Sequence, residues 1–230
     1  GENPKGGHKL TRMGVAAHIR DYFQKAAEYK EKKDAALAEG KPFDIDLNLE
    51  AGYKVLKGEI PFRVHAHRHD DIVTVVRLCE ELGISYSIEH CTDGHLVAEY
   101  LGKHQVQAHV GPGLSSRGKV ELANFTDANP AVLAKAGVKV SLITDHPFLD
   151  SRYFHAYGGV AMKYGLTADE TLRMMTINPA ESIGIADRVG SLEAGKDADF
   201  IVLSGEPFTY TSVILATYIE GKQVFERPVY

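Results

Sequence analysis

The sequence contains no tryptophan and only two cysteines, Cys79 and Cys91, among its 230 residues. Two cysteines cannot build a disulfide framework, and their spacing is not that of a zinc knuckle. We therefore expect a reducing, cytoplasmic setting. The chain also lacks any apolar run near the roughly 18 residues that a membrane-spanning helix needs, so we expect no membrane segment.

A basic stretch is missing as well, because 26 Lys and Arg residues stand against 31 Asp and Glu residues, for a net charge of -5. This balance argues against nucleic acid and anionic membranes as partners. Hydrophobic residues make up 44% of the chain and charged residues 25%, which is ordinary for a globular protein and excludes disorder. The opening residues 1–7 carry neither an initiator Met nor a signal pattern, and we expect the sequence to begin within a longer protein.

Apolar residues at helical spacing predict helices over residues 12–38 and 47–57. From residue 61 onward, short apolar segments alternate with amphipathic ones. They predict strands over residues 62–66, 84–90, 106–110 and 138–143, and helices over residues 70–82, 94–101, 129–136, 154–164 and 167–176. Such strand–helix units with short connections are typical of a parallel α/β sheet. Three further strands, over residues 200–203, 213–219 and 223–225, predict a separate small antiparallel unit with a tight turn at residues 220–222.

Polar residues stand where the four parallel strands are expected to end. His65, His90 and His109 end the first three, and Asp145 follows the fourth. In a parallel α/β barrel the active site lies at these strand ends. Imidazole and carboxylate are ligands of zinc, iron and manganese, so a metal site is one interpretation. A hydrogen-bonded structural role is the alternative for each residue taken singly.

Several segments together resemble the amidohydrolase superfamily and, within it, the imidazolonepropionase-related group. They are VHAH at 64–67, IEH at 88–90, TDHP at 144–147, TINPA at 176–180 and GSLEAGKDAD at 190–199. The resemblance implies a (β/α)8 TIM-type barrel, of which this chain would be the second half. Residues 1–186 would carry strands 5 to 8 with their helices, and residues 187–230 the C-terminal strands of a small β-sandwich.

The same resemblance implies a divalent metal, zinc first, with iron or manganese as alternatives and one or two ions. His65 would be the strand 5 ligand, His90 the strand 6 ligand, and Asp145 the strand 8 ligand and general base. Glu2 and Lys5 lie near the expected end of strand 4 and are secondary candidates for bridging two metals.

The family's His-x-His pair of strand 1 is absent. His65-Ala66-His67 is not that pair, because two helices precede it and the four units that begin there cannot complete eight strands. The expected partners are therefore the missing N-terminal half of the same protein and a second copy, since open sheet edges invite pairing and homo-oligomers.

Four residues are candidates for contacting a small amide or cyclic amide substrate: His67, His109, Arg117 and His146. Each has an alternative. The alternative for His67 is a polar loop residue, and for His109 a structural hydrogen-bonded side chain. For Arg117 it is a solvated loop that also holds Lys119, and for His146 a support for its neighbour.

The expected activity is hydrolysis of C–N bonds through metal-activated water, with Asp145 as the base, once the N-terminal half is present. Peptidase, imidazolone hydrolase and deaminase are not distinguished by these residues. The alternative function is a non-catalytic barrel fragment, or a self-assembling or binding protein that lacks a complete metal site.

Overall fold

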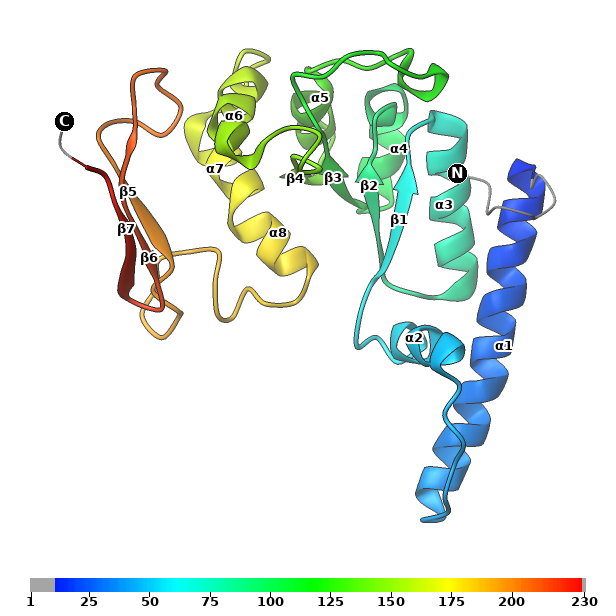
Figure 1. Ribbon diagram of the computed structural model, residues 1–230. Coiled ribbons are helices and arrows are strands. Elements are labelled where there is room, and N and C mark those ends of the chain that lie inside the picture. Colours follow the sequence, from blue (N-terminus) through cyan, green and yellow to red (C-terminus); the bar gives the residue numbers. More distant parts are fainter. Residues whose placement is uncertain (1–10, 229–230) are drawn as a thin grey trace. The chain divides into compact units, whose positions relative to one another are not determined.

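The computed structural model describes residues 11–228, and its central feature is a parallel sheet (Figure 1). The sheet has the order β1-β2-β3-β4, so every strand pairs with its neighbour in the sequence. Its strands are β1 (Phe62–Ala66), β2 (Tyr86–His90), β3 (Gln107–Val110) and β4 (Lys139–Leu142). The predicted strand–helix alternation and the parallel sheet are confirmed.

Helices follow the strands along the chain: α3 (His69–Leu82), α4 (Ala98–Lys103), α5 (Asn129–Lys135), α6 (Phe154–Met162), α7 (Ala168–Met175) and α8 (Ile177–Ser182). The single helix expected from residue 94 is instead a 3-10 turn, Gly94–Val97, followed by α4, because Val97 leaves helical geometry at φ -130° and ψ 25°. The sequence did not predict α8. Asn178 in α8 donates a hydrogen bond to the Val140 carbonyl of β4 at 2.7 Å, which docks this helix on the sheet.

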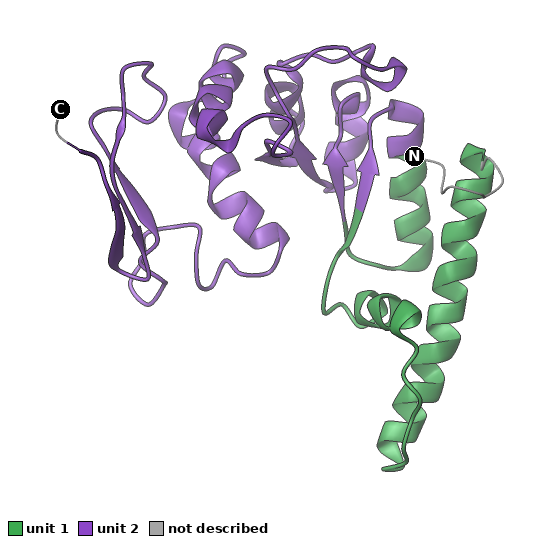
Figure 2. Cartoon of the chain, in the orientation of Figure 1, with its two compact units in different colours: residues 1–63, 73–86 green, residues 64–72, 87–230 purple. Residues whose placement is uncertain are grey.

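The chain divides into two compact units (Figure 2). One runs up to Arg63 and includes residues 73–86, and the other contains residues 64–72 and everything from Ser87 onward. The division passes through β1, β2 and α3. All residues at the strand ends that carry the predicted site belong to the second unit. The predicted boundary between residues 186 and 187 is not this division and stays a prediction.

The first unit is built around α1 (Arg12–Ala38) and α2 (Leu47–Leu56). Thr11 and Asp46 begin these helices as N-caps, each accepting a backbone N–H at the helix start. The two helices approach closely at Gly52, where an added Cβ would lie 2.7 Å from the Cβ of Ala26. A polar network also joins them, because Lys33 pairs with Glu50.

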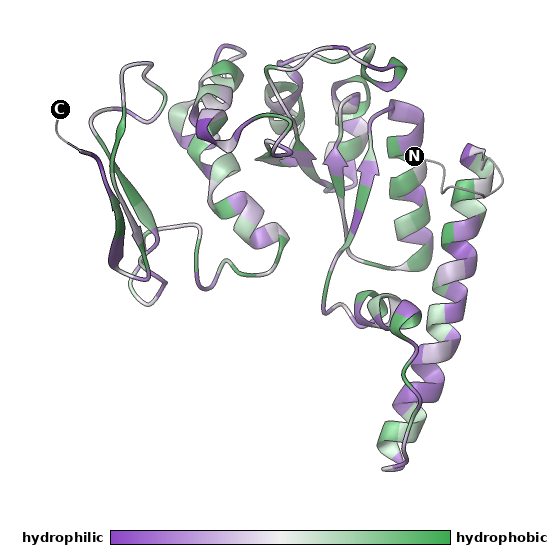
Figure 3. Cartoon of the chain, viewed as in Figure 1, coloured by the Kyte–Doolittle hydropathy of each residue, from purple (hydrophilic) through white to green (hydrophobic). Residues whose placement is uncertain are grey.

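Hydrophobic and hydrophilic residues mingle along α1 (Figure 3), as the sequence suggests for a helix with one solvated face. No helix among residues 11–228 combines the length and apolar character needed to cross a membrane.

The second unit has its core in the sheet. Ile88, Ala108, Val110, Val140 and Leu142 are all buried. Because both faces of a parallel sheet are covered, strands of this kind read as continuous apolar runs. This burial fixes the strand ends, from which the loops of the site depart.

The C-terminal residues form an antiparallel sheet of β5 (Phe200–Leu203), β6 (Ile214–Ile219) and β7 (Lys222–Glu226). The predicted hairpin turn is confirmed, with Glu220 and Gly221 at φ 50° and 73°. Large apolar side chains on all three strands remain exposed, among them Ile201, Ile219 and Val224.

Candidate metal and substrate site

The carboxyl ends of β2, β3 and β4 meet at one edge of the sheet. His90 is in register with Val110, and Val110 with Leu142. The loops that follow these strands therefore start side by side, as the sequence predicts for a strand-end site. His67 follows β1 directly, and Asp145 comes three residues after β4.

Three imidazoles converge at this edge. One nitrogen from each of His65, His67 and His90 lies within 4.8 Å of the others. The ring centroids are 4.6 Å apart for His65 and His67, and 4.4 Å apart for His65 and His90. Nitrogen ligands at about 2.1 Å from one tetrahedral ion lie about 3.4 Å from each other, so small side-chain rotations would bring this group to a metal's spacing.

Hydrogen bonds fix which ring nitrogens are available. Nδ1 of His90 lies 2.8 Å from the Gly111 carbonyl, which can only accept, so Nδ1 carries the proton and Nε2 keeps its lone pair. Nδ1 of His67 lies 2.8 Å from the Thr92 hydroxyl. Nε2 of His67 is buried with no hydrogen-bond partner among the described residues. A buried, unpartnered imidazole nitrogen beside two other imidazoles fits a metal ligand.

The electrostatics favour the neutral form of His65 and His67, which is the ligating form of histidine. Burial, with the positive charges of Lys119 and the neighbouring histidines, lowers the pKa of His67 to about 3. Burial also lowers the pKa of His65, and His90 and Lys119 add to the effect. Asp145 acts in the opposite direction on the pKa of His65, so its carboxylate is close enough to be felt there.

Two residues of the site adopt a left-handed backbone conformation, His90 at φ 68° and Asp145 at φ 51°. For residues other than glycine this conformation costs on the order of 1 kcal/mol or more. The surrounding buried sheet sustains that cost at both strand ends. As a result, the backbone turns sharply at both residues, whose side chains belong to the site.

A single cavity of about 80 Å³ joins these groups. It is lined by His65, His67, His90, Thr92, Gly111, Pro112, Ser115, Lys119, Leu122, Phe125, Asp145 and Phe148. A water molecule needs only about 10–15 Å³ of such space, so the cavity can hold an ion, a water and part of a substrate. Asp145 is outside the group of three mutually close imidazoles but lines the same cavity.

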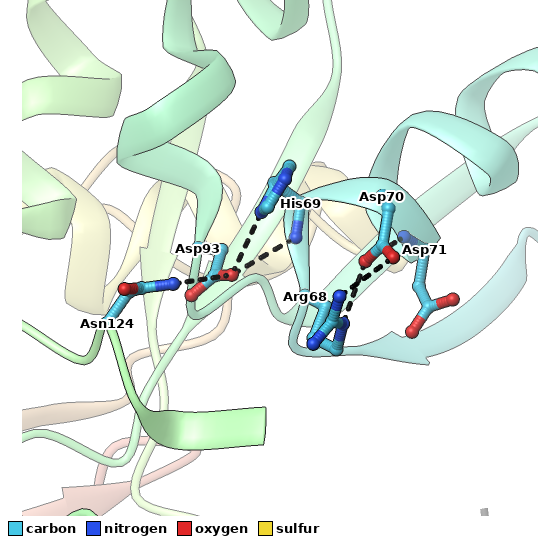
Figure 4. Close-up of polar contacts among 6 residues, drawn as sticks. All are labelled: Arg68, His69, Asp70, Asp71, Asp93 and Asn124. Atoms are coloured by element: carbon cyan, nitrogen blue, oxygen red, sulfur yellow. Dashed lines mark hydrogen bonds and ion pairs between the residues drawn. The ribbon is translucent and has the colours of Figure 1, made fainter. Parts of the chain in front are cut away.

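A buried carboxylate supports the loop that carries His67. The side chain of Asp93 is 2% exposed. Its Oδ2 accepts from the backbone N–H of His69 at 3.2 Å, and it lies 3.3 Å from both His69 Nδ1 and Asn124 Nδ2 (Figure 4). The backbone N–H of Asp93 donates to the His67 carbonyl at 2.8 Å. Asp93 therefore ties the loops after β1 and β2 to the segment around Asn124.

The other candidates lie elsewhere. His109 is buried between Ser182, whose Oγ is 2.6 Å from Nε2, and Glu89, whose carboxylate is 3.3 Å from Nδ1. It does not line the cavity.

Arg117 donates to the Phe125 carbonyl at 3.0 Å, and the exposed His146 accepts from the Ser151 backbone N–H at 3.4 Å. Glu2 and Lys5 fall outside the described residues. Cys91 is buried and its pKa is raised to about 12 by burial, which makes it an inert thiol.

Sequence reasoning missed three features. It treated His67 as a loop or substrate residue, although the alternate spacing of His65 and His67 was a visible signal for a second imidazole. It gave no role to Asp93 or to Thr92, because isolated Asp and Thr residues in a loop carry no pattern. Only the folded path of the chain brings them to His67 and His69.

Comparisons with known proteins identify the family of this chain. The Amidohydrolase family model matches residues 6–224. The amidohydrolase tasK of Hapsidospora irregularis is 24% identical over 252 residues, covering 100% of this chain and 25% of that protein. The imidazolonepropionase of Fusobacterium nucleatum is 28% identical over 212 residues, covering 82% of this chain and 46% of that protein. The solved structure of an amidohydrolase from Thermotoga maritima MSB8 is 43% identical with a TM-score of 0.92, covering 99% of this chain and 61% of that one.

The fold and the family match thus place the chain among proteins of the amidohydrolase type, which have an α/β fold of the TIM-barrel type. The chain belongs to the amidohydrolase family. The resemblance to the imidazolonepropionase-related group, inferred above from five motifs, is confirmed. The chain spans about a quarter of the Hapsidospora protein, 46% of the Fusobacterium protein and 61% of the Thermotoga chain.

Proposed function

We propose that this chain carries the metal-binding and proton-transferring residues of a hydrolase that cleaves C–N bonds in amides or cyclic amides. The observation that supports it most is the group of His65, His67 and His90, which shares one cavity with Asp145. Family membership supplies the reaction type, and the unpartnered, buried Nε2 of His67 supports the metal.

The residues would divide the work as follows. His65, His67 and His90 hold a divalent ion, for which zinc is our first choice because neutral imidazoles suit it, with iron or manganese as alternatives. When bound, such an ion polarises a carbonyl and lowers the pKa of a bound water to about 7. Asp145 takes the proton of the attacking water and passes it to the leaving nitrogen. His65 differs from His67 and His90 in being exposed, so a further ligand or a substrate can reach the site on its side.

The finer architecture is part of this proposal. We assign β1 to β4 to strands 5 to 8 of a (β/α)8 barrel, and β5 to β7 to a small β domain. The relatives extend well beyond the matched region, so we propose that full activity needs the barrel strands that lie outside this chain. Association of copies and action in the cytoplasm remain predictions, and the two buried free cysteines suit a reducing compartment.

Metal binding tests the first part. Zinc or manganese titrated into the metal-free chain is expected to bind at one ion per chain by calorimetry and native mass spectrometry. His67→Ala and His90→Ala should weaken binding at least tenfold, whereas His155→Ala, an exposed histidine on α6, should not. Equal binding by all four proteins would contradict the ligand assignment, and no binding would favour the non-catalytic alternative.

Catalysis tests the second part. Asp145→Asn in the longest active form of the protein should abolish hydrolysis of amide and cyclic amide substrates while the metal stays bound. The exposed Asp44→Asn is the control and should keep full turnover. Retained turnover in Asp145→Asn would refute the role of Asp145 as base.

A further inference from the structure

Several residues that line the cavity have no role in the proposed reaction. Besides the imidazoles and Asp145, it is lined by Lys119, Ser115 and three apolar side chains, Leu122, Phe125 and Phe148. All five come from the loops that follow β3 and β4. Loops at the carboxyl ends of barrel strands commonly determine what substrate fits, so these residues bear on substrate choice.

Lys119 brings an uncompensated positive charge to the cavity. It is exposed, and its ammonium forms no hydrogen bond or ion pair with any residue in the described part of the chain, including Asp145, the other charged residue that lines the cavity. Burial lowers the pKa values of His65 and His67, and the charge of Lys119, which lines the same cavity, adds to this effect. Arg117, two residues earlier, is instead held by the Phe125 carbonyl.

Ser115 adds a hydrogen-bonding group without a partner. Its hydroxyl is buried, and no described residue accepts from it or donates to it. Buried hydroxyls are nearly always paired in folded proteins, so an unpaired one that lines a cavity is available to a ligand. An ammonium and a hydroxyl together match one carboxylate, which takes a charge-assisted bond from the first and an ordinary bond from the second.

We propose that Lys119 and Ser115 form a subsite for a substrate carboxylate, with Phe125, Leu122 and Phe148 contacting the apolar part of the same substrate. This inference rests on the proposed function and narrows its substrate class to amides or cyclic amides that carry one carboxylate and an apolar group. One unpaired cation suits one negative charge, which favours a carboxylate over a doubly charged phosphate.

Binding of small probes tests the subsite without any turnover. Phenylacetate and its neutral analogue phenylacetamide can be titrated into the purified chain by ligand-observed NMR. Phenylacetate is expected to bind at least tenfold more tightly than phenylacetamide, and Lys119→Ala should remove that preference. Lys119→Arg should restore most of it, and the exposed Lys103→Ala on α4 should leave it unchanged.

Other outcomes would overturn the subsite. Equal binding of the two probes by the unaltered chain means that the cavity does not select a carboxylate. A preference that survives Lys119→Ala but disappears in His67→Ala means that the carboxylate coordinates a metal instead of Lys119.

Turnover gives a second, separable readout. For N-acetyl-phenylalanine, Lys119→Ala should raise KM at least tenfold with little change in kcat, whereas KM for N-acetyl-phenylalaninamide should not change. If neither compound is hydrolysed but phenylacetate binding depends on Lys119, the proposed reaction fails while the subsite stands. If hydrolysis occurs and KM ignores Lys119, the subsite fails while the reaction stands.

Discussion

Replacing Asp93 is the sharpest test of how the site is held together. In Asp93→Ala, the acceptor for His69 N–H, His69 Nδ1 and Asn124 Nδ2 disappears. Two of these three groups belong to His69, the first residue of α3, which lies two positions after His67. The backbone bond from residue 93 to the His67 carbonyl would remain. Any loss of stability or of metal affinity in Asp93→Ala is therefore due to the missing carboxylate and not to this backbone bond.

The expected loss in the free energy of unfolding follows from the burial of the carboxylate and the lengths of its hydrogen bonds. Hydrogen bonds to a charged group contribute about 1.5–3 kcal/mol each. These three are long, at 3.2–3.3 Å, and only the carboxylate end is fully buried, so we expect a total loss of about 3 kcal/mol. For a chain of this size that corresponds to a fall in Tm of about 6–12 °C. Asp93→Asn keeps the shape and one acceptor and should lose about half as much.

Thermal unfolding followed by circular dichroism measures the loss of stability. Zinc titration measures the change in metal affinity, which depends on the position of His67. Residues that orient metal ligands typically contribute about 10- to 100-fold to metal affinity, so Asp93→Ala should weaken binding within that range. Asp70→Ala is the matched control, because Asp70 pairs with nearby Arg68 at 2.9 Å and lies in the first turn of α3, next to His69, but is 43% exposed (Figure 4). An exposed pair contributes at most about 1 kcal/mol. If Asp93→Ala behaves like Asp70→Ala in both assays, Asp93 does not position His67.

Three further predictions concern other parts of the chain. Gly52→Ala forces a Cβ to 2.7 Å from that of Ala26. Alanine favours the helix more than glycine does, but the clash outweighs this gain, so denaturant titration should show a net loss of about 1–2 kcal/mol in the free energy of unfolding. The hydrogen bond from Lys33 lowers the pKa of Glu50 below its ordinary 4.5, so this stabilisation is present above pH 4.5 and is lost as the pH falls through the lower folded value. The difference in Tm between Glu50→Gln and the unaltered chain should therefore shrink between pH 6 and pH 3; a constant difference would contradict this. Burial raises the pKa of Cys79 to about 12, so its thiol should react with a disulfide reagent at pH 8 only after unfolding, which absorbance at 412 nm would follow.

The order of elements could be predicted because local rules decide it. Helical spacing and glycine stops place α1, α3 and α5 within a residue or two of their bounds, and short apolar runs place the four parallel strands. The sequence could not say which way a strand residue points. Strands buried on both faces are apolar throughout, so nothing in the pattern around His109 indicates that it faces Ser182 of α8 and not the cavity.

The site was predictable as a location and not as a set of contacts. His65, His90 and Asp145 were identified because each stands at a strand end, and they do line one cavity. The role of His67 depends on a partner 25 residues away, Thr92, whose hydroxyl holds its ring. Which of the two cations Arg117 and Lys119 lines the cavity depends on how one loop folds back on itself. No sequence rule predicts the path of such a glycine-containing loop.

The sequential order of the parallel sheet has a consequence for how the chain reaches its native state. Ser87 pairs with Gln107, and Gln107 with Lys139, so each new strand pairs with the strand before it and waits for no later part of the chain. The entropic cost of closing the loop between two such strands rises only slowly with loop length, although parallel strands pair more slowly than helices form. Each strand–helix unit can therefore add to its predecessor as it leaves the ribosome, while Asp145, at the end of the last strand, reaches the imidazoles only after the fourth strand has paired. The growing chain would bring its imidazoles together first and add Asp145 last.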